Sequence, residues 1–339
     1  MNVEDFEIII KKIKKIENIL EKIKKRIVKS NNIAIIGHVN PDGDCIGAQL
    51  GLGLSLEALG KTVYNINQGP FDGDYARSFE NNFIKDTESK IDLYIIVDSA
   101  SDARISYDQD KIDLNKTIVI DHHLSNTKFG KINWIDDAYL STCEMIFLLL
   151  FFLRIDFNEI ISQHLLNGVL SDNGYFQHIK KDKFFSLYIA YLLIKYGGDP
   201  NFSRNLMFCN NTLQTEKMFA LALSRLESRA DGKILYSYIY DKEKNEIGDF
   251  HSGMFFRETT SIKGVKISVF FKIDEEKEMI NISFRSTDEI DVSKAANFFG
   301  GGGHKVAAGA HIRGEFSEVK EKTLKLLEDL LLDPASISS

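Results

Sequence analysis

Short apolar runs alternate with helical patterns over the first half of the chain. The runs are IAIIGH, TVYNIN, LYIIVDSA and TIVIDHH, and a helical pattern over 46–59 follows the first of them. Near-continuous runs of Ile, Val and Leu are typical of strands that are buried on both faces. The alternation therefore predicts an α/β domain built on a doubly wound, mainly parallel sheet.

Helices are predicted both before and after this region. Over 3–27 apolar residues recur every three or four positions among lysines, which predicts a basic amphipathic helix. Such a face can lie on a membrane, but packing on a neighbouring domain is its commoner use. Further helices are predicted over 143–153, 159–170 and 184–196, and Gly197-Gly198-Asp199-Pro200 is a strong stop signal.

The pattern changes after this stop signal. Helices are predicted over 213–229 and 316–332, and the runs ILYSYIY, VKISVFFKI and MINISFRS between them are strand-like. We therefore expect a first domain over 1–196, a linker over 197–212 and a second, smaller α+β domain over 213–339. The length of 339 residues fits two domains, since single cores rarely grow beyond about 250–300 residues.

The amino-acid composition limits the cellular compartment and the classes of binding partner that we expect. The three cysteines are widely spaced without a CxxC pair, which argues against a disulfide framework and a thiolate zinc site. No apolar run approaches the ~20 residues of a membrane span, so we expect a cytoplasmic protein without a membrane partner. The net charge of −7 argues against binding to long nucleic acid, and an anionic substrate would need local positive charge.

Carboxylates and imidazoles occur where three predicted strands end. They are His38, Asp42 and Asp44 in GHVNPDGD, Asp98 in LYIIVDSA, and Asp121, His122 and His123 in TIVIDHH. Ligands of open α/β sheets gather at the carboxyl ends of strands, so these groups should share one edge. Such a set without thiolates favours manganese or magnesium. Asp172 in SDNG is a fourth candidate, although an isolated Asp-Asn-Gly is more often a turn.

The ordered motifs GHVNPDGD, VDSA, DHH and SDNG resemble those of the DHH phosphoesterase superfamily. Downstream, FGGGGHKVAAG resembles the glycine-rich signature of the associated DHHA1 domain, so the resemblance spans 33–313. Within the superfamily the chain is most similar to standalone DHH–DHHA1 enzymes, which comprise NrnA-like oligoribonucleases and pAp phosphatases and DhhP-type cyclic di-AMP phosphodiesterases. In the fourth motif this chain has Asn173 where the family often has threonine, which leaves open an unusual substrate.

The resemblance implies two divalent metal ions, with Mn²⁺ favoured. Its metal ligands would be His38, Asp42 and Asp98 for one ion, and Asp44, Asp98, His122 and Asp172 for the other. Asp98 would then bridge the ions. Asp121 would orient an imidazole, and His123 would face the scissile phosphate as a hydrogen-bond donor or acid.

The resemblance places substrate binding largely in the second domain. Its residues would be Arg285, Gly301, Gly302, Gly303 and His304, and Arg104 after the second motif is a further candidate. A run of glycines lets backbone N–H groups approach an anion closely, although such a loop alone is more often a flexible turn. The other histidines, His164, His178, His251 and His311, match no ligand spacing and are expected to be structural.

One segment between the third and fourth motifs has two interpretations. Ser141-Thr142-Cys143-Glu144 precedes an apolar run and predicts a helix N-terminus of the capping-box type. A Ser or Thr at this place could also touch the site.

The function expected from these residues is hydrolysis of short nucleotides. The substrates would be nanoRNA and pApA-type linear dinucleotides, with cyclic di-AMP and pAp as further candidates. The protein could form a homodimer. One alternative is an inorganic pyrophosphatase or exopolyphosphatase, which shares the first-domain motifs. Another is a non-catalytic cyclic-dinucleotide-binding protein, which the filled ligand positions disfavour.

Overall fold

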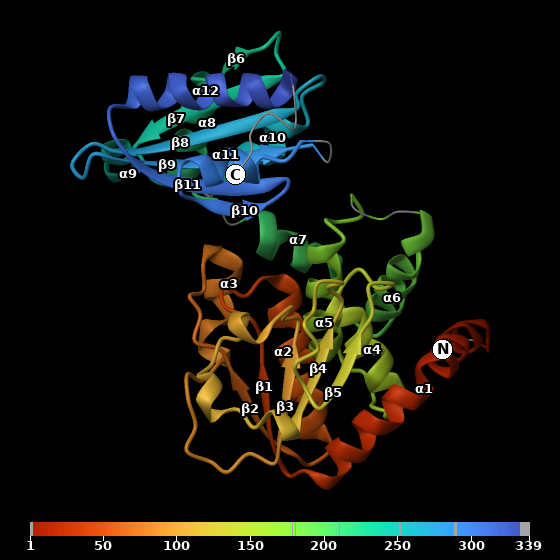
Figure 1. The fold of residues 1–339 in the computed structure, drawn as a ribbon. Coiled ribbons are helices and arrows are strands. Elements are labelled where there is room, and N and C mark those ends of the chain that lie inside the picture. Colours follow the sequence, from red (N-terminus) through yellow and green to blue (C-terminus); the bar gives the residue numbers. More distant parts are fainter. Residues whose placement is uncertain are drawn as a thin grey trace. The chain divides into compact units, whose positions relative to one another are not determined.

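The computed structural model describes residues 3–177, 179, 181–209, 211–250, 252–287 and 290–332, with side chains from residue 7 onward. The chain divides into two compact units, Met1–Asn210 and Asn211–Ser339 (Figure 1).

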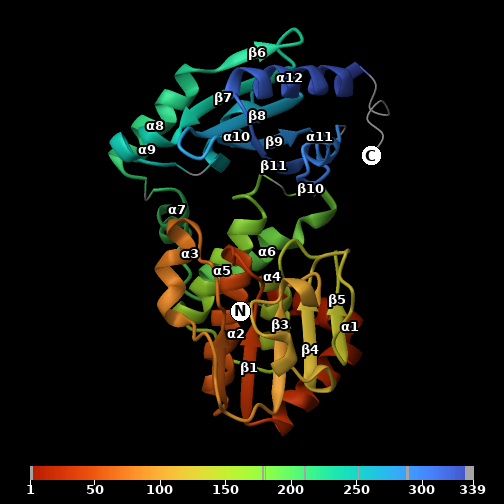
Figure 2. The same ribbon diagram turned by 60° about the vertical axis from the view of Figure 1, so that its left-hand side comes forward.

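The first unit is built on a five-stranded parallel sheet (Figure 2). Its strands are β1 (Asn32–Ile36), β2 (Thr62–Ile66), β3 (Leu93–Val97), β4 (Thr117–Asp121) and β5 (Ile132–Ile135). The strand order is β2-β1-β3-β4-β5, which is a doubly wound order with its switch point between β1 and β3. The predicted fold class is confirmed. Strand β5 was not predicted, because its four residues INWI form no apolar run.

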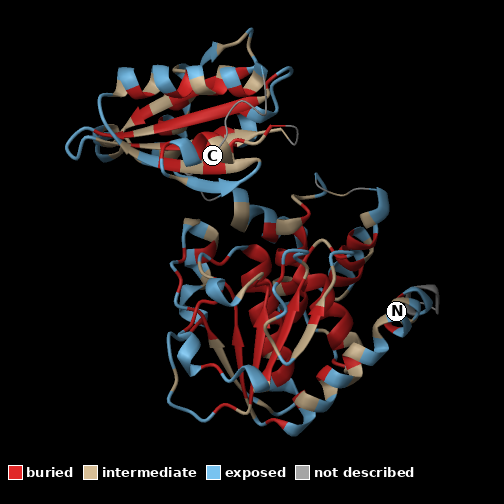
Figure 3. Cartoon of the chain, in the orientation of Figure 1, coloured by how far each residue is buried: buried red, intermediate tan, exposed pale blue. Residues whose placement is uncertain are grey.

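Both faces of this sheet are buried (Figure 3). Ile33 and Ile35 of β1 belong to a core shared with helices, whereas Ala34 and Ile36 belong to a second core on the opposite face. The helices are α1 (Val3–Lys29), α2 (Gly43–Ala58), α3 (Gly73–Phe79), α4 (Thr142–Phe152), α5 (Glu159–Asp172), α6 (Phe185–Lys195) and α7 (Pro200–Phe208). Alternate strand residues therefore serve two cores, as the continuous apolar runs predict.

Helix α1 contributes its apolar stripe to the core of the first unit. Ile9, Leu20, Ile23 and Ile27 are at most 1% exposed within that core. Packing, the commoner use of such a stripe, is what the structure shows. Among the described residues, no helix has both the length and the apolar character needed to cross a membrane.

The segment predicted as a linker contains helix α7. The Asp199 side chain accepts a hydrogen bond from the Asn201 backbone N–H, and Pro200 occupies the first turn. The Ser203 hydroxyl donates to the Asn167 side chain of α5 at 2.7 Å. Gly197-Gly198-Asp199-Pro200 therefore ends α6 and also begins α7, because aspartate caps a helix N-terminus and proline fits its first turn.

The second unit holds a six-stranded mixed sheet in the order β10-β11-β9-β8-β7-β6. Its strands are β6 (Glu227–Arg229), β7 (Ile234–Tyr240), β8 (Ile267–Asp274), β9 (Met279–Ser286), β10 (Gly302–His304) and β11 (Ala307–Arg313). Its helices are α8 (Leu213–Ser224), α9 (Asp241–Glu246), α10 (Ser252–Thr260), α11 (Ser293–Phe298) and α12 (Phe316–Leu332). Helices α11 and α12 share one core with the sheet, and α8 and α10 share another.

The predicted helix over 213–229 was too long. Helix α8 ends at Ser224, and Glu227–Arg229 form strand β6 against β7. Ala230, Asp231 and Gly232 all have positive φ and form the tight turn between these strands. Pairing with β7 therefore overrides the helical pattern at 225–229.

Candidate active site

The candidate site begins at the sheet's switch point, where β1 and β3 end. His38 follows β1 and is 5% exposed. Its Nδ1 lies 2.8 Å from the Val39 carbonyl oxygen, so Nδ1–H donates there and Nε2 carries the lone pair. Nε2 lies 3.4 Å from Asp98 Oδ2 and 3.8 Å from Asp42 Oδ1. The ring therefore presents a ligand nitrogen to two carboxylates.

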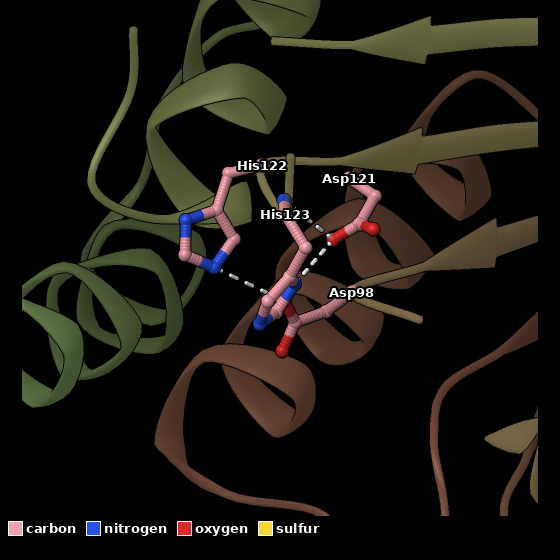
Figure 4. Close-up of side chains that lie close together, drawn as sticks. All are labelled: Asp98, Asp121, His122 and His123. Carbon is pink, nitrogen blue, oxygen red and sulfur yellow. Dashed lines mark hydrogen bonds and ion pairs between the residues drawn. The ribbon is translucent and has the colours of Figure 1, made fainter. Parts of the chain in front are cut away.

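Asp98 lies directly after β3 and is 2% exposed. Its two oxygens face different imidazoles, because Oδ2 is near His38 and Oδ1 lies 3.5 Å from His122 Nε2. Figure 4 shows His122 beside Asp98. The Thr142 hydroxyl donates to Oδ1 at 3.1 Å. The backbone of Asp98 has φ +55°, a conformation that costs an aspartate about 1–3 kcal/mol and is common at functional sites.

The surroundings of His122 fit a bound cation most clearly. Its Nε2 is buried and has no hydrogen-bond partner among the described residues. It lies 3.3 Å from Asp172 Oδ2 and 3.5 Å from Asp98 Oδ1, and burial lowers its pKa. Two ligands bound to one ion at about 2.1 Å lie roughly 3.0–3.5 Å apart, so these separations fit a shared metal ion.

Asp44 and Asp172 are carboxylates near His122. One oxygen from each and the His122 nitrogen lie within 4.8 Å of one another. Burial and the charge of Asp98 raise the pKa of Asp44, and burial and the charge of Asp44 raise that of Asp172. A divalent cation would relieve this repulsion, so the donor set fits a metal ion.

Helix N-termini hold two of these carboxylates. The Asp44 oxygens accept backbone N–H bonds from Thr142 at 2.6 Å and Cys143 at 2.9 Å, at the start of α4. Asp42 is the N-cap of α2, where its Oδ1 accepts from the Asp44 and Cys45 backbones at 3.1 Å each. Asp42 therefore caps α2, and the spare lone pairs of its carboxylate leave room for a metal as well.

The segment before α4 is a helix N-terminus, as predicted, but the Glu144 side chain accepts from the Leu140 backbone N–H instead of completing a capping box with Ser141. Ser141 caps the helix and accepts from the Glu144 backbone N–H at 3.2 Å. Thr142 touches the site through Asp98. Its hydroxyl and the two backbone donors to Asp44 tie α4 to the sheet edge that carries the candidate site.

Asp121 and His123 form a pair beside Asp98 (Figure 4). His123 Nδ1 lies 2.7 Å from Asp121 Oδ1, and the Asn126 amide donates to Asp121 Oδ2 at 2.7 Å. The hydrogen bond that His123 donates to Asp121 raises the pKa of His123. The fully buried carboxylate thus orients a half-exposed imidazole through its Nδ1.

Glycines let α2 and α5 approach closely enough for their carboxylates to meet. A Cβ on Gly47 would lie 2.4 Å from the His164 carbonyl oxygen, and one on Gly168 would lie 2.2 Å from Cys143 Sγ and 2.9 Å from Asp44 Oδ1. The signal for this contact, glycines at 43, 47 and 51 on one helix, is present in the sequence but was not used in the prediction.

Two further residues are connected to this set, one by its side chain and one by its backbone. Cys45 groups with His38 and Asp98, but burial raises its pKa to about 11, so it is a thiol at neutral pH and a weak metal ligand. Arg104 has an exposed side chain, and its carbonyl accepts the Val39 backbone N–H at 2.8 Å. Its backbone thus supports the loop that carries His38.

In the second unit the register brings Arg285 and His304 onto one face. His304 pairs with Ala307, which pairs with Arg285. The Arg285 guanidinium lies 4.9 Å from the centre of the Phe256 ring, and Nη1–H donates to the Phe284 carbonyl at 2.9 Å. Burial lowers the pKa of Arg285. Phe256 is itself buried in the core of this unit.

The glycine-rich segment is shaped by its contacts with β11. A Cβ on Gly301 would lie 2.1 Å from the Gly309 carbonyl oxygen, and one on Gly303, which has φ +144°, would lie 2.6 Å from the Ala307 carbonyl oxygen. Gly302 has room for a side chain. His304 is exposed, and His178 and His251 lie outside the described residues.

Family models match both units of the chain. Residues 32–171 match the DHH family, N-terminal domain, and residues 231–333 match the DHHA1 domain. The chain therefore belongs to the DHH phosphoesterase superfamily, with a DHH domain followed by a DHHA1 domain. A site of buried carboxylates and imidazoles at the switch point agrees with a family that uses divalent metals.

Individual relatives can be aligned with this chain over most of its length. The bifunctional oligoribonuclease and PAP phosphatase NrnA of Thermus thermophilus is 27% identical and is aligned over 88% of this chain and 90% of its own. The protein of that name from Bacillus subtilis is 26% identical over 83% and 90%. An exopolyphosphatase-related protein from Bacteroides fragilis has a TM-score of 0.80 at 25% identity, covering 94% of this chain and 98% of its own.

Proposed function

We propose that this protein is a manganese-dependent, two-metal phosphodiesterase and phosphatase of short nucleotides. The observation that carries the proposal is the position of Asp98, whose two oxygens face two different imidazoles from a buried site. The relatives named oligoribonuclease and PAP phosphatase support a nucleotide substrate. The proposed substrates are nanoRNA and pApA, with cyclic di-AMP and pAp as further candidates.

The proposal assigns the metal-binding groups to the first unit. The ligands would be His38, Asp42 and Asp98 for one ion, and Asp44, Asp98, His122 and Asp172 for the other. When bound, two such ions supply an activated water and neutralise charge on the phosphoryl group. The oxygen and imidazole donors favour manganese over a thiophilic ion.

His123 would handle the proton of the leaving group. Asp121 holds Nδ1–H and raises the pKa of His123, so more of the imidazole is protonated near neutral pH. The protonated Nε2 can then donate to the leaving oxygen. Asp121 keeps the ring in this orientation and is itself fixed by Asn126.

The second unit would bind the part of the substrate that does not react. Arg285 and His304 share one face of the sheet, and the backbone of Gly301, Gly302 and Gly303 would lie against a phosphate or base. Arg104 is a further candidate for phosphate. The proposal needs no long nucleic acid and no membrane, and it places the enzyme in the cytoplasm as a monomer or homodimer.

A second candidate is hydrolysis of polyphosphate or pyrophosphate. The exopolyphosphatase-related structure from Bacteroides fragilis favours it. Both candidates use the same metal edge and differ in what the second unit binds.

One assay separates the candidates. The purified full chain is stripped with a chelator, reloaded with manganese and offered pApA, a short oligoribonucleotide, cyclic di-AMP, pAp, pyrophosphate and polyphosphate. We expect hydrolysis of at least one nucleotide, loss of this activity after chelation and recovery of the activity with manganese. Faster turnover of polyphosphate or pyrophosphate than of every nucleotide would favour the second candidate. Tight cyclic-dinucleotide binding without any turnover would leave a binding protein, and full activity in protein shown by elemental analysis to be metal-free would end the two-metal account.

A further inference from the structure

The turn that follows Asp172 contains a large aromatic residue in a strained conformation. Helix α5 ends at Asp172 with a Schellman motif, in which the Gly174 backbone N–H donates to the Ser171 carbonyl and the Tyr175 N–H donates to the Leu170 carbonyl. Gly174 has φ +59°, as this motif requires. The cap of α5 is therefore complete at Gly174.

The chain nevertheless stays in the left-handed region for two more residues. Tyr175 has φ +51° and Phe176 has φ +74°. This conformation is uncommon for any residue except glycine and is costly for bulky side chains. Since the helix cap does not need these two residues to be left-handed, their strain requires another reason.

The two aromatic residues have different surroundings. Tyr175 is partly buried, and its ring packs edge-on against Phe208 of α7 at 5.0 Å between centroids. Phe176 is 48% exposed. An exposed phenylalanine gains little from burial, so packing does not explain why its backbone is held in this conformation.

Asn173 holds Phe176 in place. It is fully buried, its Oδ1 accepts the Phe176 backbone N–H at 3.0 Å, and its amide donates to Ser186 Oγ of α6 at 3.3 Å. Asn173, which stands where the family often has threonine, thus holds the turn in its conformation. Phe176 lies four residues after Asp172, a proposed metal ligand. Phe176 is tied to the same helix end as Asp172.

We propose that Phe176 is a base-stacking residue that positions a nucleobase of the substrate beside the metal edge of the first unit. The inference rests on the proposed nucleotide hydrolase function and adds a specificity-determining residue to it. An exposed ring with a fixed backbone provides a flat apolar surface at low entropic cost. Stacking on such a ring accepts any base, because every base has a π face.

The test separates the effect of losing the aromatic ring from the effect of changing the backbone conformation. Phe176→Asn removes the ring but tolerates the left-handed region, and Phe176→Trp keeps an aromatic face. Phe184→Asn is the matched control, because Phe184 is 65% exposed and has an ordinary φ of −60°. KM and kcat are measured for pApA and for an analogue of pApA that lacks both bases, together with the melting temperature.

We expect Phe176→Asn to raise KM for pApA about 5- to 150-fold, the range of one lost base stack, with kcat within about threefold. KM for the abasic analogue should change less than about threefold, and the melting temperature should not fall below that of Phe184→Asn. Phe176→Trp should restore the KM for pApA. A structural role would instead lower the melting temperature and affect both substrates equally.

The outcomes separate this inference from the proposed function. If wild-type protein hydrolyses no nucleotide, the proposed function fails first. If wild type cleaves pApA but Phe176→Asn matches Phe184→Asn on pApA, or changes both substrates equally, the stacking role is wrong. The stacking role is also wrong if Phe176→Trp loses as much as Phe176→Asn.

Discussion

At the scale of single residues, Asp98 is the most constrained carboxylate of the candidate site. It is buried, has positive φ, and accepts a hydrogen bond from Thr142 while its two oxygens face His38 and His122. A buried carboxylate between two imidazoles would be stable without a metal only if the imidazoles carried charge. Burial lowers the pKa of His122, which works against a charged ring at that position and favours a cation there instead.

The first prediction concerns this residue. Asp98→Ala should abolish hydrolysis of every substrate and reduce bound manganese, because the loss of a bridging carboxylate removes a ligand from both ions. Turnover and metal content are measured together on folded protein. Asp137→Ala, at an exposed aspartate, is the control and should retain both. Activity of Asp98→Ala within about tenfold of wild type at saturating manganese would show that Asp98 is not the bridge.

The sequence predicted the proposed ligands better than the residues that support them. Strand ends are visible in a hydrophobic pattern, so His38, Asp98 and His122 could be placed at one edge. Asn126 was not predicted, because its contact with Asp121 depends on how the loop after β4 folds back. No periodicity encodes such a contact.

At the scale of elements, the close pair α2 and α5 brings Asp44 to Asp172. Gly47 and Gly168 allow the backbones to approach, and Gly51 continues the contact two turns from Asp44, where a Cβ would lie 2.7 Å from the Leu165 side chain. The same interface therefore has a part near the site and a part away from it. This difference allows a matched comparison.

The second prediction uses that comparison. In Gly168→Ala the new Cβ would meet Cys143 Sγ and Asp44 Oδ1, so kcat should fall on the order of 100-fold as the carboxylate shifts. Gly51→Ala overpacks only a flexible leucine end. Both variants should lose about 1–3 kcal/mol of unfolding free energy. Equal losses of kcat at equal stability would mean that the glycines serve packing alone.

Helix α4 carries a buried acid, Glu144, in its first turn. Glu144 is 1% exposed, and its Oε1 has no hydrogen-bond partner in the described part of the chain. Burial raises its pKa from 4.5 to about 7. The folded chain therefore holds more protons than the unfolded chain between these two values, and stability falls as the pH rises through that window.

The third prediction follows from this sign. Glu144→Gln mimics the protonated acid, so it should match wild type near pH 4.5 and be more stable at pH 8. The gain has an upper bound of roughly 3 kcal/mol, from 1.36 kcal/mol per pKa unit. Urea unfolding at both pH values measures it, with exposed Glu57→Gln as the control. A gain of equal size at both pH values would contradict a raised pKa.

Helices and strands differ in how far their own sequence pattern predicts them without tertiary contacts. Strand β9 occupies the predicted run MINISFRS, and α12 spans its predicted residues, because each has a strong periodicity of its own. Helix α7 and strand β5 were not predicted. Each is short, and each is stabilised mainly by contacts with a neighbour, α5 for the helix and β4 for the strand.

At the scale of the whole molecule, the chain consists of two units with separate cores. The first unit carries the carboxylates and imidazoles, and the second carries Arg285, His304 and the glycine-rich segment. If the metals cleave while the second unit only holds the distant part of a nucleotide, chemistry and recognition should be separable by mutation.

The last prediction tests this separation with two substrates. Arg285→Ala or His304→Ala should lower kcat/KM on pApA about 10- to 150-fold, because a hydrogen bond to a charged group contributes roughly 1.5–3 kcal/mol. Hydrolysis of bis-p-nitrophenyl phosphate, which has no second nucleotide, should change less than about threefold. Arg313→Ala, at an exposed arginine in β11, is the control for lost positive charge and should spare both substrates. A misfolded variant would lose both activities together, so the ratio of the two rates reports recognition alone. If both substrates lose rate in equal proportion while the variants remain folded and metal-loaded, the second unit takes part in the chemical step, and His304 would belong with His123 among the catalytic residues.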